Sequence, residues 1–245
     1  MALATPTPPT SSAITPASPR NEPSRPTSRS SALASLACGS ENAPRPAGDD
    51  PRDLDAQAGV LPRTVLFLGT SLTAGYGLDP QQAYPALIGR RIEEAGLPHR
   101  VVNAGVSGET SAGALRRIDW LLRQPFEVLV LETGANDMLR GADLEATRDN
   151  LQALVDRVRT QRPEVRIVLV ALRAPPNLGA AYGRRFAALY AELARDNDLP
   201  LVPFLLEGVG GRPELNLPDG VHPNAAGQRR LAENVWKVLR PVLEG

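Results

Sequence analysis

The chain has 245 residues, and its 27 basic and 27 acidic side chains give a formal charge of zero. The arginines are interspersed with acids, so no basic stripe indicates nucleic acid, and no apolar run approaches the roughly 18 residues that span a membrane. One cysteine and two histidines cannot supply a His/Cys zinc site, so we expect no bound metal, no nucleic-acid partner and no transmembrane segment.

Residues 1–60 form the first predicted region and differ in composition from the rest. They are dense in Pro, Ser, Thr and Ala and hold almost no aromatic or large aliphatic side chains. Such a segment cannot bury enough apolar surface to offset the entropy of ordering, so we predict that it is disordered. The stretch around Cys38 resembles the end of a bacterial lipoprotein signal, although its apolar part is short and the preceding segment is long. Cys38 is therefore a candidate lipid anchor, and we expect a periplasmic or cell-envelope location, with a cytoplasmic location as the alternative.

Strand-like and helix-like patterns alternate through residues 61–245, the second predicted domain. Apolar, β-branched runs predict strands at residues 64–68, 101–103, 128–131, 167–172 and 201–204. Helical patterns lie at residues 84–95, 111–122, 144–160, 183–196 and 225–239. This alternation is typical of a parallel sheet covered by helices on both faces. We therefore predict an α/β fold, a flavodoxin-like three-layer α/β/α sandwich with a five-stranded parallel sheet.

Ser71 lies just after the first predicted strand, and the residues that could activate it as a nucleophile lie elsewhere in the chain. Serine attacks well only when an imidazole takes its proton and a carboxylate orients that imidazole. Of the two histidines, His99 lies in a polar turn and is predicted to be solvated, whereas His222 follows Asp219 by three residues. An Asp-x-x-His pattern alone is more often a capped turn. Together with Ser71 it predicts a catalytic triad of Ser71, His222 and Asp219.

Two more strand ends carry hydrogen-bond donors. Gly108 lies in a Gly-rich turn after the second strand, and Asn136 follows the third strand. Because ligands bind at the carboxyl ends of parallel strands, we expect both residues to lie near Ser71. A free backbone N–H and an amide side chain there can stabilise an oxyanion. Ordinary turns are the alternative for each segment alone, since Gly and Asn are favoured in turns for backbone reasons.

The four blocks resemble those of a known family, the GDSL or SGNH hydrolases. The blocks are Gly69-Thr70-Ser71-Leu72, Gly108, Gly134-Ala135-Asn136-Asp137 and Asp219-x-x-His222. The likeness is strongest with the branch described as thioesterases, arylesterases and lysophospholipases. It implies the SGNH hydrolase fold, with Ser71 as nucleophile, His222 as base and Asp219 as its orienting carboxylate. It also implies an oxyanion hole made by the backbone N–H groups of Ser71 and Gly108 and the side chain of Asn136.

Two positions depart from the family pattern. Thr70 stands where the family has Asp, and Ala135 stands where it has a second Gly. Neither position carries the proton transfer, and the Thr70 hydroxyl can still tie the turn together. The chain has no Gly-x-Ser-x-Gly elbow, which argues against the larger α/β-hydrolase fold. The run Gly75-Tyr76-Gly77 lacks the last glycine of a dinucleotide fingerprint and is interpreted as a turn.

The expected activity is that of a serine esterase or thioesterase of the arylesterase, acyl-CoA thioesterase or lysophospholipase type. Ser71 would form an acyl-enzyme from a small-molecule ester or thioester, and water would then release the acyl group. No cofactor is needed, and we expect a monomer. A carbohydrate O-acetylesterase is the alternative enzyme, because the same blocks occur in branches that deacetylate polysaccharides. A non-catalytic binding module on the same fold is the alternative from another class.

Apolar side chains in two loops are candidates for substrate binding. Met138 and Leu139 follow the Asn136 block, and Pro175 and Leu178 lie after the fourth strand. We expect these four side chains to contact the acyl group, because they flank the predicted edge of the site. Packing against neighbouring helices is the alternative. The length of the acyl chain does not follow from these residues.

Overall fold

The computed structural model describes residues 63–245, which contain a five-stranded sheet of order β2-β1-β3-β4-β5. The strands are β1 (Arg63–Gly69), β2 (His99–Gly105), β3 (Val128–Leu131), β4 (Arg166–Val170) and β5 (Leu201–Val202). Every neighbouring pair is parallel. The predictions made for residues 1–60, including the one for Cys38, fall outside the described residues.

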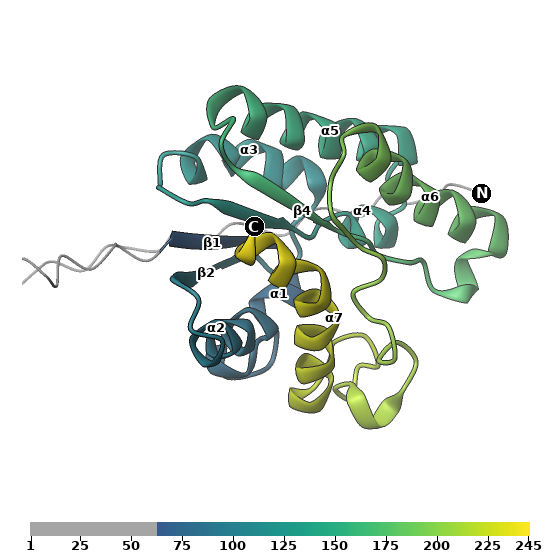
Figure 1. Cartoon of the computed structure of the whole chain (residues 1–245). Helices are drawn as coiled ribbons and strands as arrows, with labels where there is room; N and C mark the ends of the chain where they lie inside the picture. The colour runs from purple at the N-terminus through teal and green to yellow at the C-terminus, as the bar shows by residue number, and fades with distance from the viewer. Residues whose placement is uncertain (1–62) are drawn as a thin grey trace, which may run out of the picture. The chain divides into compact units, whose positions relative to one another are not determined.

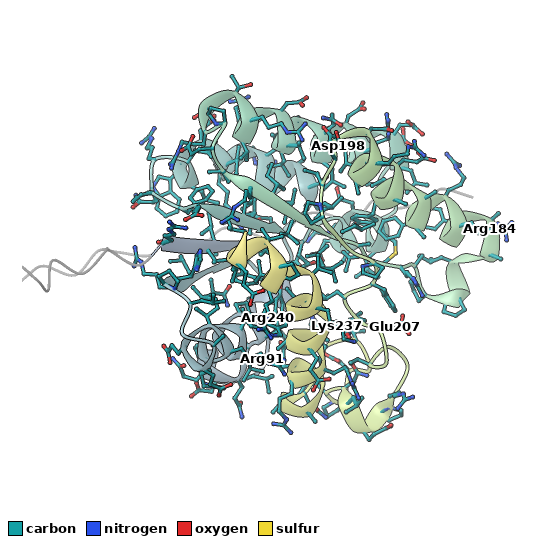
Figure 2. All side chains as sticks on the ribbon, viewed as in Figure 1. Arg91, Arg184, Asp198, Glu207, Lys237 and Arg240 are labelled. Atoms are coloured by element: carbon teal, nitrogen blue, oxygen red, sulfur yellow. The ribbon has the colours of Figure 1, made fainter. Side chains whose placement is uncertain are left out.

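Helices lie on both faces of this sheet. They are α1 (Ser71–Ala74), α2 (Tyr84–Glu94), α3 (Ser111–Leu121), α4 (Ala135–Leu139), α5 (Leu144–Gln161), α6 (Ala180–Asp196) and α7 (Ala225–Glu244). Figure 1 shows α3, α5 and α6 on one side and α2 and α7 on the other. The charged side chains of Arg91, Lys237 and Arg240 project from the α2 and α7 side (Figure 2). The predicted three-layer α/β/α sandwich is confirmed.

Burial on both faces explains why the central strands are continuous apolar runs. All four residues of β3 are buried, and in β1 only Arg63 is exposed. Phe67 of β1 packs edge-on against Tyr84 of α2, with ring centroids 5.7 Å apart. A parallel strand covered by helices on both sides cannot alternate apolar and polar residues, because both of its faces belong to the core.

His99 departs from what its surroundings in the sequence predict. It is the first residue of β2, and its register partner in β1 is Arg63. Its side chain is 0% exposed and its Nε2 lies 4.0 Å from Oε2 of Glu127. Burial lowers the pKa of His99 below its ordinary value. The predicted solvated imidazole was therefore wrong, because strand pairing begins immediately after the turn that ends at Pro98.

The strand order places a ligand-binding edge between β1 and β3. The chain passes from β1 outward to β2 and then returns to the other side of β1, so the direction of winding reverses there. In open parallel sheets a crevice forms at this point, outside the carboxyl ends of the strands. Ser71 follows β1 and Asn136 follows β3, so both lie at this edge of the sheet. Among the helices of residues 63–245, none combines the length and apolar character that a membrane crossing requires.

Candidate active site

Ser71, His222 and Asp219 form one hydrogen-bonded row. Oγ of Ser71 lies 3.0 Å from Nε2 of His222, and Nδ1 of His222 lies 2.7 Å from Oδ2 of Asp219. When the Nδ1 proton is directed at the carboxylate, Nε2 presents its lone pair to the Ser71 hydroxyl. This arrangement allows His222 to take the serine proton while Asp219 stabilises the positive charge that forms on the ring.

The short loop from Asp219 to His222 holds the carboxylate in its ionised form. Oδ1 of Asp219 accepts hydrogen bonds from the backbone N–H groups of Val221 at 2.9 Å and His222 at 3.0 Å. The His222 backbone N–H, followed by the His222 ring and the Val221 N–H, lowers the pKa of Asp219 to about 2. Asp219 therefore remains a carboxylate throughout the pH range in which an imidazole titrates.

Helix α7, which follows His222, is hydrogen-bonded directly to α1, the short helix that begins at Ser71. Asn224 caps α7, since its side-chain oxygen accepts from two backbone N–H groups of the first turn. One turn later, the buried Gln228 accepts from the Tyr84 N–H at 2.8 Å and donates to the Leu72 carbonyl at 3.3 Å. Gln228 thereby joins α7, α2 and α1. We did not predict this role, although a polar residue on the buried face of a helix is a recognisable signal.

The loops after β2 and β3 are bonded to each other where the oxyanion donors are expected. Gly108 has a φ of +78°, and its carbonyl accepts from Nη2 of Arg140 at 2.8 Å. The side-chain amide of Asn136 donates one hydrogen to the Glu109 carbonyl at 2.9 Å. This bond orients the amide and leaves its second N–H available. The roles of Gly108 and Asn136 in holding an oxyanion remain predictions.

Asp137 anchors the same region to α3. Its carboxylate accepts from the Ser111 backbone N–H at 2.8 Å and from the Ser111 hydroxyl at 2.5 Å. Asn150 of α5 donates to that hydroxyl at 3.0 Å. Because Asp137 directly follows Asn136, this network holds the amide of Asn136 at a constant place relative to α3 and α5.

A buried carboxylate beneath the nucleophile explains how the chain tolerates Thr70. Oε2 of Glu132 accepts from the Thr70 backbone N–H at 2.8 Å and from the Thr73 hydroxyl at 2.7 Å, and the Thr70 hydroxyl donates to Oε1 at 3.0 Å. The Thr70 hydroxyl therefore does tie the turn that presents Ser71. Glu132 is 0% exposed, and burial raises its pKa to about 7 against the opposing effect of these hydrogen bonds. We did not predict a role for Glu132, although a carboxylate at the end of an apolar run was a visible signal.

Replacing Glu132 by Gln is expected to flatten the pH dependence of stability. Between the ordinary pKa of 4.5 and the folded-state value of about 7, the unfolded chain releases a proton that the folded chain retains. The free energy of unfolding therefore falls as pH rises through this window, by up to about 3 kcal/mol from this group. Gln cannot ionise, yet its oxygen can still accept from Thr70 and Thr73. Urea unfolding at pH 4.5 and pH 8 measures the effect, and the exposed Glu93→Gln is the control. If the free energy of unfolding fell equally between pH 4.5 and pH 8 in wild type and in Glu132→Gln, the prediction would be contradicted.

The four predicted substrate-binding residues are not equivalent. Leu139 is 59% exposed and Leu178 is 39% exposed, and Pro175 is also on the surface. Met138 is only 8% exposed and belongs to the hydrophobic core. The difference arises because α4 turns Met138 inward while the next residue points outward. Contact of these loops with a substrate remains a prediction.

A serine, an imidazole and a carboxylate lie in one hydrogen-bonded row at the carboxyl edge of the sheet, an arrangement typical of serine hydrolases. No group of three or more His, Cys, Asp or Glu side chains suited to a metal ion occurs within residues 63–245. The chain belongs to the GDSL-like lipase/acylhydrolase family, whose sequence model matches residues 67–230. The family predicted from the four blocks is thus confirmed.

Known relatives cover most of the described residues. Esterase TesA of Pseudomonas aeruginosa is 41% identical over 182 residues, which are 74% of this chain and 90% of the relative. Thioesterase 1/protease 1/lysophospholipase L1 of Escherichia coli is 38% identical over 182 residues, which are 74% of this chain and 85% of the relative. A crystal structure of TesA superposes with a TM-score of 0.71 at 40% identity, covering 74% of this chain and 99% of that one.

Proposed function

We propose that this protein hydrolyses carboxylic esters or acyl thioesters through an acyl-enzyme on Ser71. The observation that carries the proposal is the row from Ser71 to His222 to Asp219, with distances of 3.0 Å and 2.7 Å. The relatives named as esterase and as thioesterase support the same substrate classes. Each step of this chemistry has a side chain of this chain that is suited to it.

In the first half of the reaction, Ser71 Oγ bonds to the carbonyl carbon while its proton passes to Nε2 of His222. The carbonyl oxygen becomes an oxyanion, for which the N–H groups of Ser71, Gly108 and Asn136 are the candidate donors. The bond from carbon to the leaving oxygen or sulfur then breaks, and the leaving atom takes the proton from Nε2. Asp219 stays ionised and stabilises the transient imidazolium.

In the second half, water attacks the acyl-enzyme from the position that the leaving group has vacated. His222 takes a proton from the water and returns it to Ser71 Oγ as the acid departs. The exposed side chains of Leu139, Pro175 and Leu178 support an apolar environment for the acyl chain. The two halves together consume one ester or thioester and one water, and no oxidant, reductant or other reactant is needed.

The test is hydrolysis of p-nitrophenyl esters from acetyl to dodecanoyl, together with labelling by a fluorophosphonate. We expect kcat/KM to rise with acyl length, because longer chains bury more apolar surface. Each fully buried CH₂ contributes about 0.8 kcal/mol. Mass spectrometry should find the phosphonyl group on the peptide that contains Ser71. Activity confined to the acetyl ester would instead indicate an O-acetylesterase. Absence of both labelling and hydrolysis would contradict the enzyme assignment.

A further inference from the structure

Tyr76, directly after α1 and its Gly75 cap, presents an aromatic ring to the catalytic imidazole. The ring centroids of Tyr76 and His222 are 4.4 Å apart and the two planes are tilted by 36°. Although it contacts His222, Tyr76 remains 50% exposed. A large side chain that lies against a triad member and is still open to solvent has a free surface for a substrate group.

The backbone around Tyr76 holds this ring in place. The Tyr76 N–H donates to the Ser71 carbonyl at 3.0 Å. The flanking residues Gly75 and Gly77 have φ values of +74° and +75°, which side chains rarely adopt. A Cβ at Gly77 would lie 2.8 Å from Cδ1 of Leu217, so the turn packs closely against the loop that leads to the triad Asp and His. The same local structure therefore positions the Tyr76 ring and the nucleophile.

The reaction itself determines which part of a substrate reaches Tyr76. In acylation the bond between Ser71 Oγ and the carbonyl carbon forms, the bond from carbon to the leaving oxygen breaks, and the Nε2 proton of His222 goes to that oxygen. The leaving oxygen must then lie within about 3 Å of Nε2. Its substituent consequently extends past the imidazole, where the exposed ring of Tyr76 lies. The carbonyl oxygen points elsewhere, toward the candidate donors Gly108 and Asn136.

We propose that Tyr76 is the leaving-group contact of this site and makes the enzyme prefer esters of flat aromatic alcohols over esters of aliphatic alcohols with equal acidity. The inference rests on the proposed function, which it deepens by naming the leaving group. A stacked or edge-on aromatic pair should favour the aromatic ester over the aliphatic one by about 3- to 10-fold, beyond the effect of buried area. Acidity must be matched, because phenols leave more readily than most alcohols on any enzyme.

The experiment compares phenyl acetate with hexafluoroisopropyl acetate, whose leaving alcohols are of similar acidity. The ratio of their kcat/KM values is measured for the full chain and for Tyr76→Phe and Tyr76→Leu. We expect wild type and Tyr76→Phe to favour the phenyl ester by about 3- to 10-fold, and Tyr76→Leu to bring the ratio close to unity. Phe should suffice because, within residues 63–245, no hydrogen bond engages the Tyr76 hydroxyl.

A matched control is Trp120→Leu, which removes a 60% exposed aromatic side chain of α3. Trp120 lines a groove that runs along β2 and that includes none of Ser71, Tyr76 and His222, so its loss should leave the ratio unchanged. An equal decrease for both esters in Tyr76→Leu would overturn the inference, because the ring would then act only through His222.

A second measurement needs no variant. Phenol should inhibit the wild-type enzyme competitively at a lower concentration than cyclohexanol, which has a similar size but no flat ring. Equal inhibition by the two alcohols would overturn the inference even if Tyr76→Leu failed to fold. Failure of the proposed function has a different signature, since Ser71 would then not be labelled by the fluorophosphonate and neither ester would be hydrolysed.

Discussion

Replacing Ser71 by Ala is expected to lower kcat/KM for p-nitrophenyl esters by at least about 10³-fold. The variant lacks the atom that bonds to the carbonyl carbon, so only water attack assisted by the remaining groups is left. Folding should change little, because Ser71 is partly exposed and its Oγ bonds only to His222 within residues 63–245. Steady-state kinetics with circular dichroism measures both properties.

The matched control is Ser107→Ala. Ser107 is an exposed serine one residue before Gly108, and it has no partner in the row of Ser71, His222 and Asp219. Its replacement should change kcat/KM by no more than about threefold. If Ser71→Ala retained a tenth or more of the wild-type rate, Ser71 would not be the nucleophile.

Replacing Asp219 by Asn is expected to lower kcat by about 10³- to 10⁴-fold with little change in KM. The Asn oxygen can keep the hydrogen bonds from the backbone N–H groups of Val221 and His222, so the loop should retain its shape. The amide NH₂ then faces Nδ1 of His222 and favours the tautomer in which Nε2 carries the proton. Such an imidazole cannot accept the proton of Ser71.

Glu214→Gln provides the control for Asp219→Asn. Glu214 is an exposed carboxylate in the same connection between β5 and α7, whereas the His222 ring is hydrogen-bonded to Asp219 and Ser71. Both variants remove one negative charge, so a general electrostatic effect would appear in both. A loss of less than about tenfold in Asp219→Asn would contradict its assigned role in orienting the imidazole.

The element pattern was predicted closely, and the differences have local causes. β5 ends at Val202, two residues earlier than predicted, because Pro203 has no N–H with which to continue the pairing. α6 begins at Ala180, before the predicted start at Gly183, since a glycine inside a helix is tolerated. The continuous apolar runs of β1 and β3 were reliable because strands buried on both faces permit little else.

The row of Ser71, His222 and Asp219 could be predicted because very few residues of this chain are suited to such chemistry. With two histidines and one Asp-x-x-His pattern, there was almost no choice of candidate base once Ser71 had been chosen as the candidate nucleophile at the end of a strand. The supporting residues could not be predicted in this way. Glu132 and Gln228 act through contacts with segments 62 and 156 residues away in the sequence, and no local pattern encodes such pairs.

The amino-acid sequence alone therefore determined the order of strands and helices and the candidate reacting side chains, because periodicity and chemical function are properties of short segments. Tertiary structure decided what depends on distance and burial. It brings Ser71 to 3.0 Å from His222 across 151 residues of chain, and it raises the pKa of Glu132 by removing water. It also places the Tyr76 ring against the imidazole. These features arise from the packing of separate segments at one edge of the sheet, where water is excluded and distances are set by the whole fold.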